Sequence, residues 1–464
     1  MYDMVGKVNP RQSIIYLIIF FEGLVAIAVE ILAIRQLIPF VGNSVIITSM
    51  VIGLFLLFLA GGYYRGGKFN CNLLMILRIN LTIAALIIGV GLSTSFLIFW
   101  FFYLFQVIKI NLLWALITYL LLIIAPVTYL LGQTIPITMN LFPPSVRVGE
   151  IGGKVLSIST CGSFLGAVFT TIILMNTLGV AVTILINTLL LACLTLFITH
   201  NYKKLLLQLI IVIGILLFTY LMNVQAEKKL FVSTDSYANY QIENLPASQG
   251  KLLIINFSPS SAIYSNQKGF RYIELIKTVL FNNLQYQNKS ILVLGAGGFT
   301  LNSPENLHNK ITYVDIDKKL KKIVVPQFQK KINGNFIAQD ARIYLTQSQQ
   351  HYDAIIVDTY SNLTMIPTYL LTQEFFQTIR KHLNHNGLAV FNIVANPTLS
   401  DKYSKTIDNT LRSVFSSCMS VPLRYTNGFT NILYFCQENK QTDDESIYTD
   451  NLNTSDIDYF ANKD

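Results

Sequence analysis

Long runs of apolar residues fill the first half of the chain. A helix needs about 20 mostly apolar residues to cross a membrane. Seven stretches have this character, at residues 13–34, 44–64, 73–93, 111–131, 154–176, 178–199 and 205–223. An eighth run, residues 96–108, is shorter but strongly apolar, and Lys109 bounds it. We therefore predict a multi-span α-helical membrane domain of about eight helices over residues 1–223.

The number of spans decides on which side of the membrane the rest of the chain lies. With eight spans and the N-terminus inside, the cytoplasmic segments carry seven Lys and Arg residues: Lys7, Arg11, Arg65, Lys68, Lys109, Lys228 and Lys229. The opposite side carries five: Arg35, Arg147, Lys154, Lys203 and Lys204. This is a weak positive-inside bias. It predicts a multi-pass membrane protein whose second half is cytoplasmic, whereas seven spans would place that half outside.

Ionisable residues and one glycine motif interrupt the apolar runs. Glu22 and Glu30 lie in the first span, and Arg35 lies at its far end. Charges are costly in a membrane, so these residues predict a polar site or a pathway, although a Glu30–Arg35 pair that fixes the helix end is the simpler alternative. Gly162 and Gly166 form a GxxxG motif, which predicts close packing of helices.

After residue 223 the pattern changes to short apolar runs separated by turn residues. Strand-like runs at 240–245 and 251–257 and a helix at 270–281 predict a linker and small β-hairpin region over residues 224–290. Strand and helix patterns then alternate over residues 291–436, which predicts an α/β Rossmann-like domain with a parallel, doubly wound sheet. The tail at 437–464 is polar and acidic, and we expect it to be disordered.

Composition agrees with this division and excludes several functions. Hydrophobic residues make up 52% of the 464 residues and charged residues 13%, with a mean hydropathy of +0.50. The net charge of +9 is explained by basic residues beside membrane spans, and without a basic-aromatic stripe we predict no nucleic-acid partner. The five cysteines lack CxxC spacing, and the histidines form no metal motif. Three of the cysteines lie in or beside apolar spans, and we expect packing roles for these rather than disulfides. We also expect no bound metal.

The second half opens with a glycine-rich turn after an apolar strand. Gly295, Gly297 and Gly298 follow the run Ile291–Leu294, and an acid, Asp315, ends the next strand about 20 residues on. Glycines let the backbone approach a nucleotide, and a carboxylate at that position accepts the ribose hydroxyls. The residues at 302–305 (Asn-Ser-Pro-Glu) leave little room for a long helix after the turn. This favours an adenosyl-sulfonium cofactor over a dinucleotide, whose pyrophosphate needs a helix N-terminus.

Further polar groups follow the next two strands. Asp340 and Ala341 follow the third strand, where an acid can receive an adenine amino group. Asp358, Tyr360 and Ser361 follow the fourth, where reacting groups meet. Ligands bind beyond the carboxyl ends of such strands, so these residues predict one site.

The soluble half resembles the spermidine synthase family, whose core has the class I methyltransferase-like fold. The whole chain is similar to a bacterial group in which that domain is fused to a membrane region. The motifs that carry the resemblance lie at residues 21–35, 126–136, 352–361 and 366–376. The resemblance implies S-adenosylmethionine or its decarboxylated form as cofactor, a small amine or polyamine as substrate, and a homodimer. It also implies that Asp315 binds ribose, Asp340 binds adenine, Asp358 accepts a proton from the attacking amine, and Tyr272 lines the amine channel.

The chain departs from the family pattern where the amine would bind. The family's second acid, three residues after the catalytic one, is Ser361 here, and the loop GAGGFT lacks the acid that holds the aminopropyl ammonium. A family glutamine is Ser260 or Ser261, and a family histidine is Ile273. We therefore predict a membrane-bound transferase in polyamine metabolism that moves an aminopropyl or related group to an amine. A methyltransferase, and a transporter or sensor that uses Glu22 and Glu30, remain the alternatives.

Overall fold

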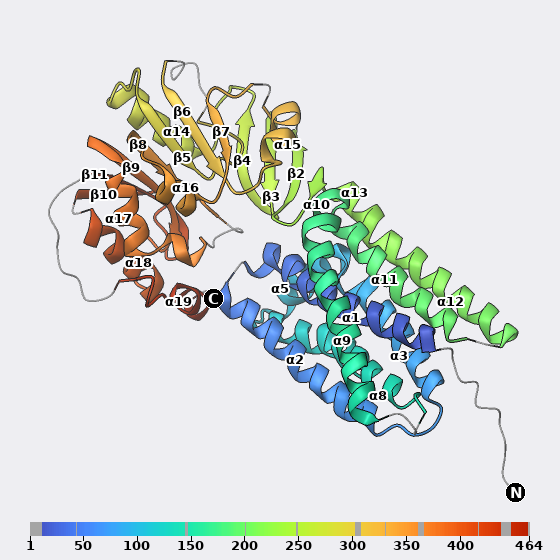
Figure 1. The fold of residues 1–464 in the computed structure, drawn as a ribbon. Helices are drawn as coiled ribbons and strands as arrows, with labels where there is room; N and C mark the ends of the chain where they lie inside the picture. Colours follow the sequence, from blue (N-terminus) through green and yellow to red (C-terminus); the bar gives the residue numbers. More distant parts are fainter. Residues whose placement is uncertain are drawn as a thin grey trace, which may run out of the picture. The chain divides into compact units, whose positions relative to one another are not determined.

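The chain folds into two compact units in a computed structural model. The helical unit comprises Met1–Leu37, Val45–Leu230 and Thr234–Ser236, and the sheet unit comprises Ile38–Ser44, Phe231–Ser233 and Tyr237–Asp464 (Figure 1). The structure describes residues 12–42, 44–143, 147–199, 201–246, 249–301, 308–329, 331–360, 366–415, 417–437 and 447–462.

Seven helices among the described residues of the helical unit are long and apolar enough to cross a membrane. They are α1 (Gln12–Val41), α2 (Val45–Gly67), α3 (Leu73–Gly91), α6–α8 (Leu112–Met139), α9–α10 (Val148–Leu178), α11 (Val180–Phe197) and α12–α13 (Tyr202–Leu230). Each contains or overlaps one of the seven long apolar runs. The eighth run forms a shorter apolar helix, Thr94–Leu104, which continues into α5 (Phe105–Ile108). At ~1.5 Å per residue, this helix is shorter than the ~30 Å hydrocarbon core.

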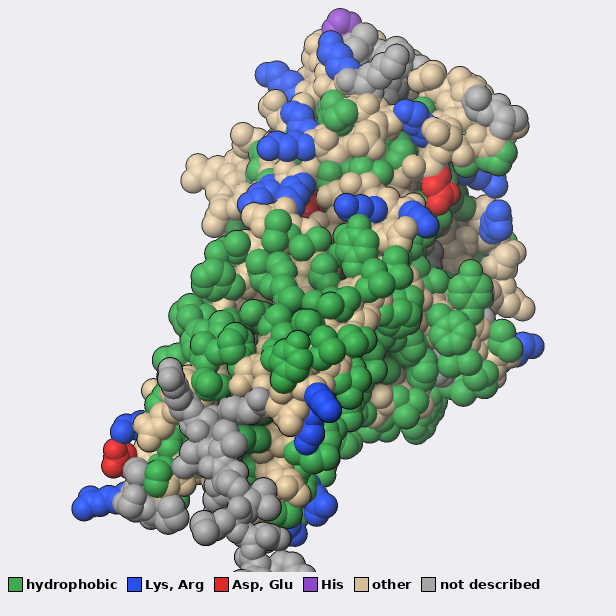
Figure 2. Space-filling model, turned by 90° about the vertical axis from the view of Figure 1, so that its right-hand side faces the viewer, with side chains coloured by type: hydrophobic (Ala, Val, Ile, Leu, Met, Phe, Trp, Pro, Cys, Tyr) green, Lys and Arg blue, Asp and Glu red, His purple; other side chains and the backbone are tan. Residues whose placement is uncertain are grey.

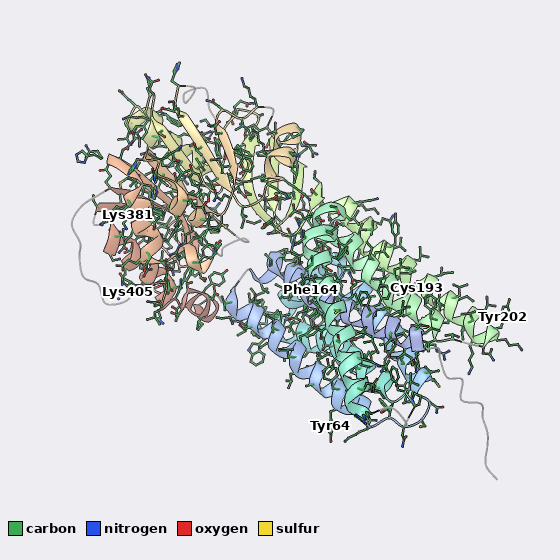
Figure 3. The ribbon with its side chains drawn as sticks, in the orientation of Figure 1. Tyr64, Phe164, Cys193, Tyr202, Lys381 and Lys405 are labelled. Carbon is green, nitrogen blue, oxygen red and sulfur yellow. A yellow bond between two sulfur atoms is a disulfide. The ribbon has the colours of Figure 1, made fainter. Side chains whose placement is uncertain are left out.

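Apolar side chains gather on the surface of the helical unit, with Lys and Arg beyond them (Figure 2). Phe164 in α9 (labelled in Figure 3) is 65% exposed. Leu57 and Ile210 are 64% and 60% exposed. A soluble protein rarely shows so continuous an apolar surface. Lipid is the environment that covers it at least cost.

Glycines bring α1 and α9 into close contact. A Cβ atom at Gly162 would lie 2.1 Å from the carbonyl oxygen of Phe20, and one at Gly166 would lie 2.2 Å from that of Leu24. The GxxxG motif therefore packs helix against helix, as expected from the sequence.

A seven-stranded sheet forms the core of the sheet unit. Its order is β10-β11-β9-β8-β5-β6-β7, and only β11 runs against the others. The strands are β5 (Ser290–Leu294), β6 (Lys310–Asp315), β7 (Asn335–Ala338), β8 (Tyr352–Val357), β9 (Leu383–Ala395), β10 (Ser417–Pro422) and β11 (Thr430–Gln437). The predicted doubly wound sheet is confirmed, with the added finding that its last hairpin contributes an antiparallel strand. This is the class I methyltransferase-like arrangement.

Buried side chains cover both faces of this sheet. The helices are α14 (Arg271–Lys277), α15 (Leu320–Gln327), α16 (Ala341–Gln347), α17 (Gln373–Lys381) and α18 (Lys402–Val414). In β9, Val390 joins the core that contains Ile276 of α14. The ring of the next residue, Phe391, meets that of Phe376 of α17 edge to face, with the centroids 5.2 Å apart. Successive strand residues point to opposite faces, so a continuous apolar run is what a strand covered on both sides requires.

A second, four-stranded sheet precedes the main one. It contains β1 (Ser233–Thr234), β2 (Asn239–Asn244), β3 (Gly250–Ile255) and β4 (Ser258–Tyr264). The sequence pattern predicts β2 and β3 but not β4, because Ser-Pro-Ser-Ser-Ala carries few of the β-branched and aromatic residues that mark strands.

The C-terminal segment corrects one expectation. Residues 447–462, expected to be disordered, lie on the sheet unit and end in α19 (Ser455–Asn462). Tyr448 and Tyr459 are each 2% exposed, and the backbone nitrogen of Tyr448 donates to Thr410 Oγ1 at 2.9 Å. Two aromatic anchors in a polar segment are enough to dock it, which average composition does not reveal.

Two of the five cysteines form a bond that the sequence does not predict. Cys418 and Cys436 lie opposite each other on β10 and β11 and form a disulfide. Cys71, Cys161 and Cys193 are free. Strand register brings the pair together, and a sequence separation of 18 does not show that register.

Candidate active site

A cavity of about 740 Å³ lies at the carboxyl ends of the parallel strands. Because strand order is known, the polar residues along this edge can be placed in a row. From β7 to β11 they are Asp340, Asp315, Gly295, Asp358, Asn392 and Asn431. After the ligands that the sequence predicts, we call the side from Asp340 to Gly295 the cofactor end and the side beyond Asp358 the acceptor end.

The glycine turn after β5 lines the cofactor end with backbone. Gly295 has φ +88°, and a Cβ atom there would lie 2.1 Å from the carbonyl oxygen of Asp358. Gly297, at φ +46°, also lines the cavity, whereas Gly298 packs against Ser261 and Phe328 and does not line it. Only glycine fits at Gly295, because its φ and the nearby carbonyl both exclude a side chain.

Asp315 ends β6, and its carboxylate is bound by backbone amides. The nitrogen of Ala296 donates to Oδ2 at 3.0 Å, and the nitrogen of Asp317 donates to Oδ1 at 3.1 Å. Desolvation raises the pKa of Asp315 to about 6, and the amide hydrogen bonds oppose that rise. At neutral pH the carboxylate is ionised and can accept hydrogen bonds from a diol.

Asp340 follows β7 and caps α16. Its Oδ1 accepts from the backbone nitrogens of Arg342 and Ile343 at 2.9 and 3.0 Å, and its Oδ2 accepts from Tyr369 Oη at 2.7 Å. Ala341 lies beside it on the cavity wall. A helix N-cap holds this carboxylate in one orientation.

Asp358 lies at the centre of the row, with both carboxylate oxygens bound. Tyr272 Oη donates to Oδ2 at 2.9 Å, and Asn392 Nδ2 donates to Oδ1 at 2.8 Å. Burial raises the pKa of Asp358, and these two hydrogen bonds oppose the rise. Burial and the nearby Asp358 raise the pKa of Tyr272 well above its usual value, so the tyrosine is a neutral donor. The two hydrogen bonds orient the carboxylate, and burial strengthens it as a base.

Tyr360 lies in the cavity wall but points elsewhere. Its hydroxyl donates to the carbonyl oxygen of Asn392 at 2.7 Å and accepts from the nitrogen of Val394 at 2.9 Å. It therefore fixes β9 rather than Asp358. Ser361, the other predicted residue of this segment, lies outside the described residues. Of the two serines that could replace the family glutamine, Ser260 lines the cavity.

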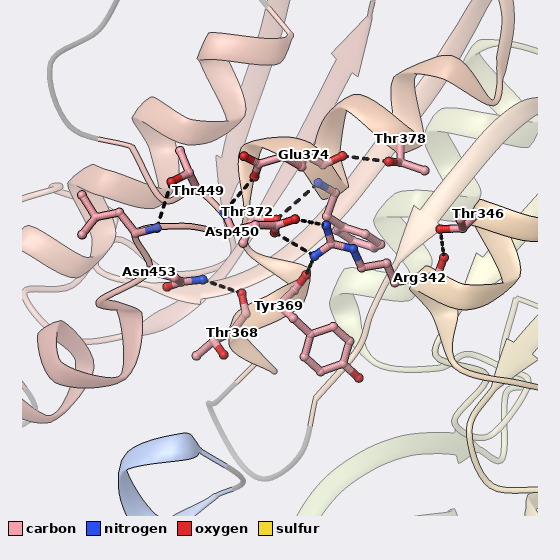
Figure 4. A network of polar contacts seen from close by, with 12 residues as sticks. Arg342, Thr346, Thr368, Tyr369, Thr372, Glu374, Thr378, Thr449, Asp450 and Asn453 are labelled. Atoms are coloured by element: carbon pink, nitrogen blue, oxygen red, sulfur yellow. Dashed lines mark hydrogen bonds and ion pairs between the residues drawn. The ribbon is translucent and has the colours of Figure 1, made fainter.

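The C-terminal segment reaches the cofactor end through a polar network (Figure 4). Arg342 Nη1 donates to Asp450 Oδ1 at 2.9 Å and to the carbonyl oxygen of Tyr369 at 2.8 Å. Asn453 Nδ2 donates to the carbonyl oxygen of Thr368 at 2.7 Å. The segment thus holds the short turn that presents Tyr369 to Asp340.

Sequence reasoning missed Asn392, Tyr369, Asn431 and the two arginines of the cavity wall, Arg271 and Arg424. One signal was available. Asn392 is the only strongly polar residue in Leu388–Ala395, whose side chains are otherwise apolar and buried. A buried amide in a central strand needs hydrogen-bond partners and therefore marks a polar site.

The polar residues of the first span do not form one cluster. Glu22 is 3% exposed, and its Oε2 has no hydrogen-bond partner. Glu30 is partly buried. Arg35 donates from Nε to the carbonyl oxygen of Asp235 at 2.7 Å. Arg35 lies five residues after Glu30 and so roughly 140° around the helix.

The sheet order defines a class I methyltransferase-like domain, which carries a row of acids at its strand ends. Residues 269–445 match the model of a family described as "Spermine/spermidine synthase domain". The C-terminal part of the chain is therefore similar to this family, and the helical region before it lies outside the match.

Individual relatives show the same likeness. A polyamine aminopropyltransferase of Saccharolobus solfataricus is 30% identical over 197 residues, which are 40% of this chain and 64% of that protein. A probable polyamine aminopropyl transferase of Bifidobacterium longum is 31% identical over 131 residues, 28% of this chain and 29% of that one. The chain thus spans less than two thirds of either relative. A solved structure of a probable spermidine synthase from Corynebacterium glutamicum superposes with a TM-score of 0.39 at 22% identity, covering 44% of this chain and 79% of that one.

Proposed function

We propose that the chain is a membrane-bound transferase that binds S-adenosylmethionine or decarboxylated S-adenosylmethionine and transfers an aminopropyl or related group to an amine. The observation that carries the proposal is Asp358. It lies between the cofactor and acceptor ends with its two oxygens held by Tyr272 and Asn392. The spermine/spermidine synthase domain supports the same chemistry.

The residues at the cofactor end fit an adenosyl group. Gly295 and Gly297 leave space that a Cβ atom would fill, Asp315 offers a carboxylate to ribose hydroxyls, and Asp340 offers one to an adenine amino group. When bound, the sulfonium supplies an activated carbon and a neutral thioether as leaving group. Asp315 and Asp340 would bind and orient it so that this carbon faces Asp358.

Asp358 would prepare the acceptor for attack. An ammonium has no free electron pair, so a carboxylate must first take its proton. The amine nitrogen then bonds to the carbon beside sulfur, the carbon–sulfur bond breaks, and its electron pair stays on sulfur. The proton resides on Asp358, whose raised pKa favours this transfer.

The test uses the full chain in detergent with decarboxylated S-adenosylmethionine and a panel of amines. We expect methylthioadenosine to be released, as measured by mass spectrometry, and release to be lost in Asp358→Asn. Binding of both cofactor forms without any thioether product would overturn the proposal.

A second candidate, methyl transfer, is favoured by the composition of the cavity wall. Of its described residues, only Asp315, Asp340 and Asp358 are acids, and none lies in the glycine turn to hold an aminopropyl ammonium. In the same assay with S-adenosylmethionine, release of S-adenosylhomocysteine selects this candidate.

We also propose that the helical unit spans the bacterial inner membrane with the sheet unit in the cytoplasm, where adenosyl cofactors are made. The disulfide between Cys418 and Cys436 opposes this side, since such bonds are rare in reducing compartments. A C-terminal alkaline phosphatase fusion decides between the two. Phosphatase that stays inactive supports the cytoplasmic side, and active phosphatase overturns it.

A further inference from the structure

The charge along the sheet edge changes sign beyond Asp358. At the cofactor end, Asp340 and Asp315 follow β7 and β6. At the acceptor end, β9 and β11 contribute the amides of Asn392 and Asn431. Asn431 Nδ2 donates to Asn392 Oδ1 at 2.9 Å, so the two amides form a chain that ends at Asp358.

Two arginines complete the acceptor end. Arg424 follows β10, whose carboxyl end lies at the same edge, and Arg271 begins α14. Arg271 Nη1 donates to the carbonyl oxygen of Leu423 at 3.3 Å, which places the start of α14 against the loop that carries Arg424. Of the described charged residues of the cavity wall beyond Asp358, these two are the whole set, and both are cations.

This wall is unsuited to a diamine. One amine of a diamine would face Asp358, but its other end remains an ammonium at neutral pH because amines of this kind have a pKa near 10. That ammonium would meet two guanidinium groups with no described carboxylate to neutralise it. Both arginines are exposed, so this is repulsion between solvated like charges that line one cavity.

We propose that the acceptor carries a nucleophilic amine at one end and an anionic group, a carboxylate or a phosphate, at the other. The amine faces Asp358, and the anion binds Arg271 and Arg424, whose planar guanidinium groups match such oxyanions. This inference rests on the proposed function and specifies its substrate class. In the transfer step the amine proton passes to Asp358, and the anionic end takes no part in bond making.

The test compares two acceptors of equal length, 4-aminobutanoate and 1,4-diaminobutane, with butylamine as the uncharged-end control. Binding to the full chain is measured by calorimetry with methylthioadenosine present, and turnover is measured with decarboxylated S-adenosylmethionine. We expect 4-aminobutanoate to bind about tenfold or more tightly than 1,4-diaminobutane. Arg424→Gln and Arg271→Gln should each weaken the binding of 4-aminobutanoate by about tenfold. The affinity for butylamine should change by no more than about twofold.

Two control variants test whether a positive charge in the cavity wall determines the affinity for 4-aminobutanoate. Arg424→Lys keeps the charge and should retain most of the affinity for 4-aminobutanoate. Lys381→Gln removes an exposed cation from α17 outside the cavity and should change nothing (Figure 3). Equal or tighter binding of 1,4-diaminobutane overturns the inference, as does failure of all three amines to bind.

Two further results separate the possible failures. If the arginine variants weaken the binding of S-adenosylmethionine but not that of 4-aminobutanoate, the arginines bind the carboxylate of the cofactor, and the inference is wrong. If 4-aminobutanoate binds selectively but no thioether is released, the proposed transfer fails, and the assignment of an anionic ligand stands.

Discussion

The two ends of the cavity differ in how the protein holds their residues in place. At the cofactor end, the backbone of Gly295 lies against the next strand, and Asp315 and Asp340 are held by backbone amides. At the acceptor end, the wall includes an exposed loop with Arg424 and Gly428, and a Cβ atom at Gly428 would meet nothing within 4 Å. Strand geometry constrains the residues of the cofactor end. At the acceptor end, a single loop residue can be substituted without moving a strand.

This difference decides which residues of the cavity can be predicted from similarity to a known family. The positions of Asp315 and Asp358 follow from the ends of β6 and β8. Residues on the β10–β11 loop are free to vary, because a surface loop changes without cost to the core. Cofactor class is therefore inferred more directly from the fold than acceptor class is.

The largest effect is expected at the boundary between the two ends. Asp358→Asn keeps the shape but removes the base, and turnover should fall by about 100- to 10,000-fold. Cofactor affinity, measured by calorimetry, should change little. Turnover within a few-fold of the original chain would show that Asp358 takes no proton.

A pair of glycine substitutions compares the ends directly. Gly295→Ala adds a Cβ atom at φ +88°, 2.1 Å from the carbonyl oxygen of Asp358, so the strand ends must separate. We expect a loss of about 1–3 kcal/mol in unfolding free energy and loss of cofactor binding. Gly428→Ala should leave both unchanged. Equal tolerance of the two substitutions would contradict the difference in packing.

pH should affect the cofactor end selectively. The pKa of Asp315 is raised to about 6, so its carboxylate is ionised above that pH and becomes protonated as pH falls through it. The dissociation constant for methylthioadenosine should rise about tenfold between pH 7 and pH 5, since about one tenth of the carboxylate stays ionised one unit below its pKa. Asp315→Asn should flatten the profile. A flat profile in the unsubstituted chain would be inconsistent with a role for Asp315 in binding.

The smallest effect concerns the C-terminal segment. Asp450→Asn removes the ion pair with Arg342 that helps to hold Tyr369 at the cofactor end. The pair is partly exposed, so we expect cofactor affinity to fall by only about two- to fivefold. Lys402→Gln, which breaks the Lys402–Asp458 pair of the same segment at 2.9 Å, should have no effect on binding. If both variants behave alike, the network of Figure 4 does not position the site.

Much of the fold was predictable from the sequence, because apolar periodicity reports burial. The strands that end at Asp315 and Val357 show this directly. The long runs before residue 223 instead predict helices with an apolar surface, such as that at Leu57 and Phe164. Acids at consecutive strand ends were predictable as one site because parallel strands share an edge.

Other parts depend on tertiary contacts that no local pattern reports. The hydrogen bond from Asn392 to Asp358 joins residues that are 34 apart in the sequence. The Cys418–Cys436 bond depends on strand register, and the docking of residues 447–462 depends on two tyrosines. Arg271 and Arg424 lie in the same wall only because α14 packs against the β10–β11 loop.

The most direct test of the central claim is calorimetric titration of the full chain with S-adenosylmethionine and with its decarboxylated form. We predict that at least one form binds, and that Asp315→Asn weakens it at least about tenfold. Asp353→Asn is the matched control, because Asp353 lies at the start of β8, away from the cavity, and binds Lys289. Binding of neither form, or equal binding by the chain and Asp315→Asn, would contradict an adenosyl-sulfonium pocket at this edge of the sheet.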